Sequence, residues 1–434
     1  MTVNIAKMKR LSSAVPLLLI TEAMMKITEI RTYLMQAATS VPQPKAGQIG
    51  HKVWDPGTSR NWLFVKVLTD EGTYGVGECS GWPRVVERAV KDLENLLVGQ
   101  DPTHIDLLWS KMQTAIMGHG VLGTVGGGAL SGIEMALWDI KGKITGQPVW
   151  SLLGGRFRDS IPLYTHASTT ERADELVALG YKGLKVGISK AGDVETLYRI
   201  REHLGMDIDL MVDAHGPPWL TVSDAIAIGR ELEACNLLFY EDPVAPDRID
   251  AFRQVREATT TPLAAGERVS TVWGMLPYIE GDLVDVIQPD TGRAGGITQM
   301  KKMAAMAEAH YITVAPHSGS LGPVGEFAAL HVMATIPNAL MLERVEHDWE
   351  GRHRVITASP VFQDGRLLVP NTPGLGVDIV EDEIAKHPSV LNIVIQPTVE
   401  NYEPGTAGEA PYFQQRRGRN RAWNRTVRSP SDDS

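Results

Sequence analysis

The sequence predicts an α/β fold in which a parallel β/α barrel follows a smaller α+β domain. Two observations carry this prediction. Residues that carry chemistry recur at intervals of 23 to 28 residues through the middle of the chain, and each stands at or just beyond the end of a short apolar run. Such an interval accommodates one strand, one helix and two short loops, so these side chains are expected at the C-terminal ends of successive parallel strands. The recurring residues are Lys185, Asp213, Glu241, Glu267, Asp290, His317 and Glu343.

Residues 25–150 lack this repeat and predict the α+β domain. Strand patterns occupy 25–34 and 61–69, and the Asp-Glu-Gly sequence at 70–72 predicts a tight turn. The segments with helical spacing are 85–97, 105–117 and 130–144. The Pro- and Gly-rich stretch 41–60 has no pattern of its own, and we interpret it as a lid, with an ordinary surface loop as the alternative.

The barrel helices and the end of the chain follow from the same patterns. Helical segments at 171–179 and 222–232 fill two of the gaps, and six or more strand–helix units favour a closed barrel over an open sheet. The expected parts of the chain are an N-terminal disordered extension (1–24), the α+β domain (25–155), the barrel (156–345), a segment returning to the first domain (346–402) and a basic disordered tail (403–434).

Composition limits the classes of function. The chain has 434 residues and a net charge of −10, which argues against nucleic acid as a partner. The cysteines, Cys79 and Cys235, lack metal-site spacing and favour a reducing cytoplasm. No apolar run is long enough to cross a membrane. The apolar stretch 14–20 loosely imitates a signal peptide but is short and contains Pro16, so we expect a cytoplasmic protein without a membrane partner.

Three of the recurring residues, Asp213, Glu241 and Glu267, predict a metal site. Carboxylates gathered in one barrel mouth repel each other and their pKa values rise. A hard divalent cation removes that cost, and ligation by oxygen alone suits Mg²⁺, or Mn²⁺ in its place. The alternative is a set of surface carboxylates.

Asp290 and His317 lie one repeat unit apart and predict a general base. A carboxylate that accepts from one imidazole nitrogen fixes the tautomer and raises the basicity of the other nitrogen. A lone histidine is more often structural, and the acidic partner on the neighbouring strand favours catalysis.

The combination of motifs resembles the enolase superfamily, and within it the mandelate racemase-like branch, from residue 25 to about residue 397. The motifs are IleGluMetAlaLeuTrpAspIleLysGly (133–142), GlyTyrLysGlyLeuLys (180–185), ValAspAlaHisGly (212–216), TyrGluAspPro (240–243), AlaGlyGlu (265–267), GlnProAspThrGlyArgAlaGlyGlyIleThr (288–298), AlaProHis (315–317) and LeuGlu (342–343). The resemblance implies a (β/α)7β modified TIM barrel under an α+β capping domain, a bound Mg²⁺ and a symmetric homo-oligomer.

The resemblance also implies removal of the proton α to a substrate carboxylate, with Lys185 and a protonated Glu343 close to the charge that develops. Lys185 matches the first lysine of the family's Lys-x-Lys motif, whereas the second position is Gly187. A racemase needs a base on each face of the α-carbon, so racemisation is disfavoured. Muconate-type cycloisomerisation, which uses both lysines, is disfavoured for the same reason.

His215 stands two residues beyond Asp213 and on an extended strand end points to the same side. Acid sugar dehydratases similar to galactonate dehydratase and mannonate dehydratase have a histidine in this Asp-x-His position, where it protonates the departing β-hydroxyl. The resemblance thus implies dehydration of an aldonate or aldarate to a 2-keto-3-deoxy acid. The alternative for His215 is a hydrogen-bonding neighbour of the metal ligands.

Other residues are candidates for contacts with the sugar. One is His166, which follows Tyr164 and Thr165. The others are His51, Trp54 and Trp82, which we take as lid residues that contact the distal hydroxyls. Two other functions remain open at this stage: an epimerase or lactone cycloisomerase on the same scaffold, and a non-catalytic binding protein. The complete metal triad and the histidine–aspartate pair argue against the second, because neither is needed for stability.

Overall fold

The structure, a computed structural model, describes residues 25–37, 60–118, 120, 122–188, 192–214, 219–319, 321–346, 348–389 and 413–414. The expected extension 1–24, nearly all of the expected lid, and the residues His51, Trp54 and His215 lie outside the described residues. Within the segment expected to be a disordered tail, β15 (Phe413–Gln414) pairs in parallel with β7 (Trp219–Leu220), which departs from that expectation.

An antiparallel sheet opens the described chain. Its strands are β1 (Ile27–Ala37), β2 (Arg60–Thr69) and β3 (Tyr74–Cys79), paired in that order. The predicted turn at 70–72 is confirmed, because Gly72 has a φ of +81° and donates its N–H to the Thr69 carbonyl. The three predicted helices are confirmed as α1 (Pro83–Leu97), α2 (Ile105–Met117) and α3 (Gly123–Thr145).

Helix α3 begins seven residues earlier than its sequence pattern predicts. Its first turns contain Gly126, Gly127 and Gly128, which lower helix propensity. A Cβ at Gly127 would lie 2.1 Å from the Arg293 carbonyl oxygen, and one at Gly128 would lie 2.4 Å from that of Ser80. Close backbone packing against the rest of the protein therefore extends the helix through residues that an isolated peptide would leave unfolded.

A closed ring of parallel strands forms the second part. Successive neighbours pair in parallel from β4 to β11, and β12 pairs in parallel with β4. A parallel bridge between Val314 and Ala339 closes the ring between β11 and the residues before β12. The strands are β4 (Ser160–His166), β5 (Gly183–Gly187), β6 (Asp209–Asp213), β8 (Phe239–Glu241), β9 (Leu263–Ala265), β10 (Val286–Ile287), β11 (Thr313–Val314) and β12 (Leu342–Glu343).

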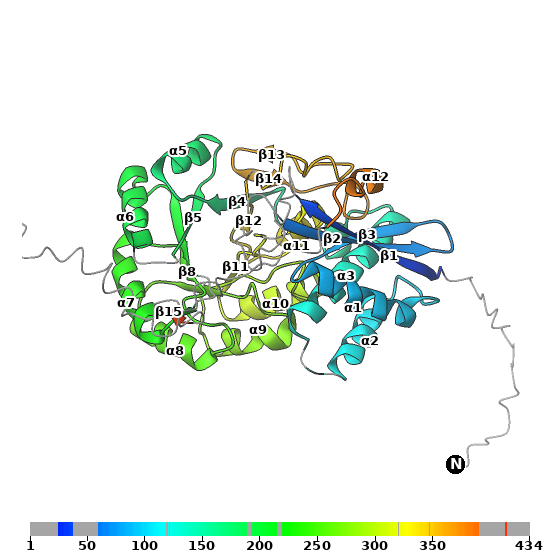
Figure 1. The fold of residues 1–434 in the computed structure, drawn as a ribbon, viewed down its shortest axis with the longest axis horizontal. Coiled ribbons are helices and arrows are strands. Elements are labelled where there is room, and N and C mark those ends of the chain that lie inside the picture. Colours follow the sequence, from blue (N-terminus) through cyan, green and yellow to red (C-terminus); the bar gives the residue numbers. More distant parts are fainter. Residues whose placement is uncertain are drawn as a thin grey trace, which may run out of the picture.

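One helix follows each ring strand except the last, so the predicted (β/α)7β order is confirmed among the described residues. Figure 1 shows these helices outside the strands. The predicted helices at 171–179 and 222–232 correspond to the first and third. The helices are α5 (Thr170–Ala178), α6 (Gly192–Leu204), α7 (Val222–Leu232), α8 (Ile249–Ala258), α9 (Thr271–Glu280), α10 (Ile297–Ala309) and α11 (Pro323–Ala334).

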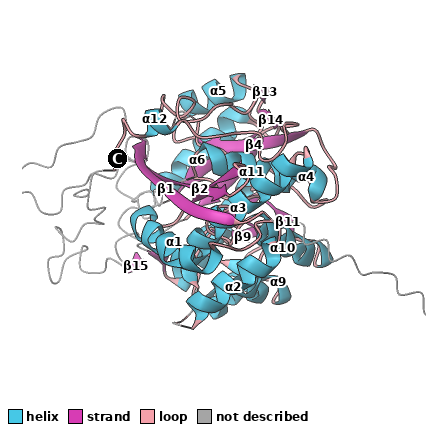
Figure 2. Ribbon diagram, turned by 90° about the vertical axis from the view of Figure 1, so that its right-hand side faces the viewer, coloured by secondary structure: helices cyan, strands magenta, loops and turns pink. Residues whose placement is uncertain are grey.

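The residues after the barrel run back across the first sheet (Figures 1 and 2). β13 (Phe362–Gln363) and β14 (Arg366–Leu368) add antiparallel strands beside β4. α12 (Glu381–Ile384) then reaches the capping domain, where Glu381 Oε1 lies 2.6 Å from Lys66 Nζ. The short elements α4 (Val149–Leu152) and η1 (Glu233–Cys235) connect larger ones. No helix in the described part of the chain is long and apolar enough to cross a membrane.

We expect Gly77→Ala to destabilise the protein by about 3 kcal/mol, because a Cβ there would lie 2.0 Å from the Gly132 carbonyl oxygen of α3. Gly118→Ala is the matched control: it is exposed at the end of α2, has a φ of −58°, and a Cβ would meet nothing closer than 3.4 Å. Urea unfolding of both variants measures the difference. Equal stabilities would contradict the close approach of β3 and α3.

Candidate active site

The recurring residues all stand at the C-terminal ends of the barrel strands, as the sequence predicts. Four lie within or at the ends of β5, β6, β8 and β12, and three follow β9, β10 and β11 by two or three residues. All of them are buried, and ion pairs join them into one group, which we call the mouth cluster. Its members are Lys185, Asp213, Glu241, Glu267, Asp290, His317 and Glu343.

Lys185 occupies the centre of the mouth cluster. Its Nζ lies 3.2 Å from Asp213 Oδ2, 2.9 Å from Glu241 Oε2 and 2.7 Å from Glu343 Oε1. Burial alone would lower the pKa of Lys185, but the three carboxylates outweigh it and hold that pKa well above the ordinary value. Lys185 is therefore a permanent cation that offsets part of the surrounding negative charge.

His317 and Asp290 form the predicted pair. His317 Nδ1 lies 2.8 Å from Asp290 Oδ2, while its Nε2 lies 2.8 Å from Glu267 Oε2 and 3.7 Å from Glu343 Oε2. Burial opposes protonation of the ring, but Glu267, Glu343 and Asp290 outweigh it and raise the pKa of His317 to about 10. In this arrangement the ring is an imidazolium. Arg293 Nε lies 3.7 Å from Asp290 Oδ2, so Arg293 contacts the carboxylate that orients the histidine.

Glu343 receives donors from several directions. Its Oε2 accepts the backbone N–H groups of Ser318 and Gly319, and its Oε1 lies 2.7 Å from His166 Nε2. The resemblance implies a protonated Glu343, but the structure gives a different result. Although burial raises the pKa of Glu343, Lys185 and His317 bring it well below the ordinary value. The carboxyl group is therefore ionised here, because two cations face it.

The carboxylates expected to bind metal carry an electrostatic cost. Burial, followed by repulsion from Asp213, raises the pKa of Glu241 to about 8. Glu241 Oε2 accepts from Gln288 Nε2 at 2.9 Å, whereas its Oε1 is buried and has no hydrogen-bond partner among the described residues. Buried polar atoms are nearly always paired, and an unpaired carboxylate oxygen suits a hard cation. The donor set of three carboxylates thus fits Mg²⁺.

Cationic side chains neutralise these carboxylates in the structure. Lys185 lies between Asp213 and Glu241, while Glu267 pairs with His317 and with Arg268. Accordingly, no group of three histidine, cysteine or acidic side chains converges closely enough to hold a metal ion within the ranges that the structure describes. The assignment of the three metal ligands therefore stays a prediction.

Other residues named from the sequence lie in different places. His166 ends β4 beside Glu343, about half exposed, so it lies at the site, and its contact with substrate stays a prediction. Trp82 precedes α1 and is 65% exposed, and no described hydrogen bond or ring contact joins it to the mouth cluster.

Three residues at the site were not predicted. Arg268 pairs with Glu267 and lies 2.7 Å from Asp242 Oδ2, and Gln288 donates to Glu241. Each lies within two residues of a predicted one: Arg268 after Glu267, Asp242 after Glu241, and Gln288 two before Asp290. That proximity was the available signal. Alternation along a strand does not show which neighbour turns inward after the strand has ended.

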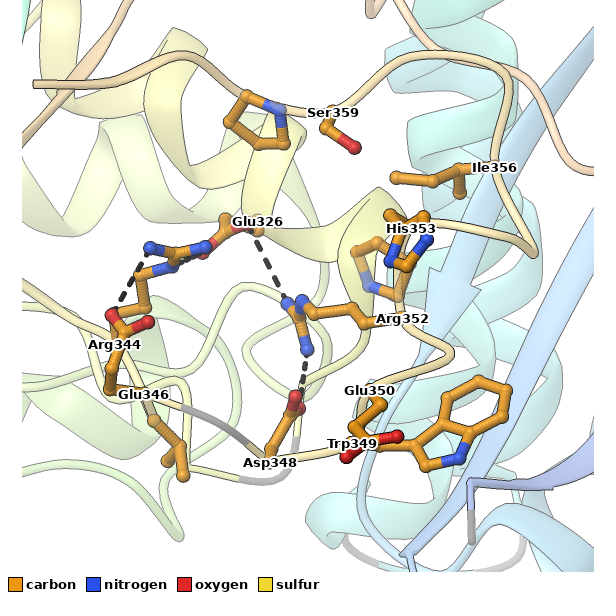
Figure 3. A pocket seen from close by; sticks show the side chains of 13 residues that line it. Glu326, Arg344, Glu346, Asp348, Trp349, Glu350, Arg352, His353, Ile356 and Ser359 are labelled. Carbon is orange, nitrogen blue, oxygen red and sulfur yellow. Dashed lines mark hydrogen bonds and ion pairs between the residues drawn. The ribbon is translucent and has the colours of Figure 1, made fainter. Parts of the chain in front are cut away.

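A cavity of about 230 Å³ lies beyond the end of β12, between the N-terminal turns of α11 and residues 344–360 (Figure 3). Two arginines in its lining are paired with acidic side chains of the same lining. Arg344 contacts Glu326 at 3.1 Å and Glu346 at 3.3 Å, and Arg352 contacts Asp348 at 2.6 Å. No member of the mouth cluster lines this cavity. These ion pairs therefore connect α11 to the segment after β12.

Comparison with known families agrees with this geometry. Residues 56–154 match the family described as Mandelate racemase / muconate lactonizing enzyme, N-terminal domain, and residues 168–383 match Enolase C-terminal domain-like. The chain thus belongs to the mandelate racemase/muconate lactonizing enzyme family of the enolase superfamily, an enzyme family that includes acid sugar dehydratases.

Relatives that carry enzyme names match most of the chain. A D-galactonate dehydratase of Ralstonia pickettii is 37% identical over 74% of this chain and 89% of its own length. A D-mannonate dehydratase of Caulobacter vibrioides is 35% identical over 76% and 92%. A D-galactarolactone cycloisomerase of Agrobacterium fabrum is 32% identical over 83% and 98%.

Solved structures are similar over the same range. An enolase of Pantoea ananatis with bound D-gluconate and Mg has a TM-score of 0.72 at 29% identity, over 84% of this chain and 95% of that one. The 3,6-anhydro-D-galactonate cycloisomerase of Zobellia galactanivorans has a TM-score of 0.74 at 30% identity, over 84% and 100%.

We expect Lys185→Met to lower the free energy of unfolding by about 3–5 kcal/mol in buffer with EDTA, because it leaves buried carboxylates without their shared cation. Arg88→Met is the control, since Arg88 pairs with Asp92 at 2.6 Å on the surface and its loss should change stability by less than about 1 kcal/mol. Chemical unfolding measures both. Similar losses in the two variants would show that Lys185 does not balance the cluster.

Proposed function

We propose that this protein is a Mg²⁺-dependent acid sugar dehydratase. It removes the proton α to the carboxylate of an aldonate or aldarate and then eliminates the β-hydroxyl as water, which yields a 2-keto-3-deoxy acid. The observation that carries the proposal is the placement of His317. Its Nδ1 lies 2.8 Å from Asp290, and its Nε2 faces Glu267 and Glu343 of the mouth cluster.

Asp213, Glu241 and Glu267 are the proposed ligands of Mg²⁺, or of Mn²⁺ in its place. When bound, the ion supplies positive charge where the substrate carboxylate oxygens become more negative as the α-proton leaves. Two features of Glu241 support this assignment: its Oε1 has no partner in the part of the chain that the structure describes, and its pKa is raised. Lys185, a buried cation in the same group, also stabilises that charge.

His317 is the proposed base. An imidazolium cannot accept a proton, so the ring must be neutral when substrate is bound. Among the groups that hold the proton on His317, Glu267 makes the largest single electrostatic contribution, ahead of Glu343. A cation held by Glu267 would offset the negative charge that favours the charged ring, and the pKa of His317 would then lie closer to the range of a general base. Asp290 continues to orient the ring through Nδ1.

His215 is the proposed acid. His317 takes the α-proton, and the electron pair of the broken C–H bond forms the enediolate. The β C–O bond then breaks, and the departing hydroxide takes a proton from His215 to leave as water. The enol tautomerises to the keto acid. His166, Trp82, His51 and Trp54 are the proposed contacts of the sugar hydroxyls. Of these, His166 lies next to the mouth cluster through Glu343.

Racemisation lacks support on the opposite face. Position 187 at the end of β5 is glycine, and a Cβ there would meet none of the described residues within 4 Å. Position 187 therefore supplies no second lysine as a base. Lactone cycloisomerisation is the second candidate function. The similarity to the Agrobacterium fabrum cycloisomerase over 98% of its length favours it, and it also begins with removal of an α-proton.

We expect His317→Asn to abolish turnover and α-hydrogen exchange in D₂O with D-galactonate, D-mannonate and D-gluconate, lowering both by more than about 1,000-fold because the base is lost. The matched control is His203→Asn, which removes a histidine paired with Asp174 at the same distance of 2.8 Å on the surface. NMR follows exchange, and a keto-acid assay follows product. Full turnover in His317→Asn would refute the assignment of the base.

The product distinguishes the two candidate functions. Dehydration lowers the mass of the sugar acid by one water, whereas cycloisomerisation or epimerisation leaves the composition unchanged. We expect mass spectrometry of the product formed in D₂O to show loss of water and one solvent deuterium on carbon. A product of unchanged composition would refute dehydration and show that the protein is an isomerase.

Metal binding is tested without turnover. We expect calorimetry to find one Mg²⁺ per chain in protein freed of metal with EDTA, and Glu241→Gln to weaken binding by at least about 100-fold, because a charged ligand is lost. Asp174→Asn is the control, since it removes a surface carboxylate. Absence of Mg²⁺ uptake by the wild-type protein would refute the proposed metal site.

A further inference from the structure

Two fully buried carboxylates of the capping domain bind the first turns of barrel helices. Glu78, in β3, accepts the N–H groups of Gly322 and Gly325, the latter at 2.8 Å, where α11 begins. Glu134, in α3, accepts the N–H groups of Ile297 at 2.8 Å and Thr298 at 2.9 Å, where α10 begins. Each carboxylate satisfies backbone donors that have no partner within their own helix.

These two helices follow the loops that carry the histidine–aspartate pair. α10 begins at Ile297 after the loop that contains Asp290, and α11 begins at Pro323 after the loop that contains His317. Among the described residues, no other carboxylate of the capping domain is hydrogen-bonded to the start of either helix. Only a short stretch of backbone therefore separates each member of the pair from a contact with the capping domain.

Further bonds fasten the loops themselves. Ser80 N donates to the Gly292 carbonyl oxygen at 2.9 Å, and Gly292 N donates to Asp290 Oδ1 at 2.8 Å. Gly295 N donates to Ser131 Oγ of α3 at 2.9 Å. The Asp290 loop is therefore held by the capping domain along its length, and a shift of that domain would move Asp290 relative to His317.

Both contacts are closely fitted and electrostatically costly. A Cβ at Gly296 would lie 2.2 Å from Glu134 Oε2, and one at Gly322 would lie 2.7 Å from Glu78 Oε1, so glycine is required for the approach. Burial raises the pKa of Glu78 and of Glu134 to about 7 in each case, against the backbone donors that lower it. An apolar pair would join two domains without this cost.

We propose that Glu78 and Glu134 are positioning residues that set the geometry between His317 and Asp290 from the capping domain. This inference rests on the proposed function, in which His317 is the base. It assigns a role to the motif at 133–142, which the proposed chemistry does not otherwise use.

The chain contains a matched control. Asp139, in α3, is a third buried carboxylate of the capping domain, and it too lies between two backbone donors, Val76 N at 2.9 Å and Leu375 N at 2.8 Å. It also pairs with Lys143. Neither donor belongs to the loops of Asp290 and His317. A carboxylate-to-amide change at Asp139 therefore introduces a comparable local defect without disturbing those loops.

The experiment compares Glu78→Gln, Glu134→Gln and Asp139→Asn by steady-state kinetics. It also measures the isotope effect on kcat of deuterium at the substrate carbon α to the carboxylate. The probes are D-galactonate, D-mannonate and D-gluconate, with Mg²⁺ and the full-length chain. Each change places an amide N–H₂ against a backbone N–H. We expect kcat to fall about 10- to 100-fold in the two glutamate variants, with KM within about threefold, because a displaced base slows proton transfer more than binding.

The isotope effect separates positioning from general destabilisation. It should rise in the two glutamate variants, since C–H cleavage becomes slower than later steps, and stay at the wild-type value in Asp139→Asn. Equal kcat in all variants, or an equal fall in all three, overturns the inference. If either glutamate variant fails to fold, Trp138→Phe removes the 2.8 Å donor to Glu134 Oε1, and we expect about a threefold fall in kcat. An unchanged kcat there overturns the inference for Glu134.

His317→Asn in the same assay distinguishes this inference from the proposed function. If His317→Asn retains turnover, the base assignment fails. If His317→Asn is inactive while the glutamate variants behave as Asp139→Asn does, the base assignment stands and the positioning role fails.

Discussion

Neutralisation of buried charge is the constraint on which the rest of this structure depends. Five carboxylates, one lysine and one histidine meet at the end of a barrel where water is largely excluded. Unpaired, such charges would cost several kcal/mol each. Lys185 contacts three of the carboxylates, and His317 contacts three, with Glu343 common to both. The two cations therefore hold the whole group together.

The arrangement of strands delivers these groups to one place. In a closed ring of parallel strands every C-terminal end faces the same mouth, so one side chain per strand suffices to assemble the group. The core of the barrel below it is apolar, with Tyr164, Met211, Phe239 and Val286 among the residues that fill it. Chemistry and stability thus occupy different layers of the same strands.

Two charge states of the mouth cluster follow from this arrangement. With only its own cations present, the cluster contains an imidazolium and an ionised Glu343. The proposed catalysis requires a neutral imidazole at His317 instead. Glu267, which pairs with the imidazolium, is also a proposed metal ligand. Under the proposed assignment, metal binding and the protonation of the base would be linked through Glu267.

The sequence alone determined the order of strands and helices and the seven recurring residues of the site. Spacing and apolar runs placed the seven recurring residues at strand ends, because periodicity of strands and helices is a local property. The tertiary structure decided what local patterns cannot encode. It extended α3 through its glycines, turned Arg268 and Gln288 inward, ionised Glu343, and brought Glu78 and Glu134 to helix starts more than 160 residues away in the chain. Each of these depends on burial and on approach between distant segments, which exist only after the chain has folded.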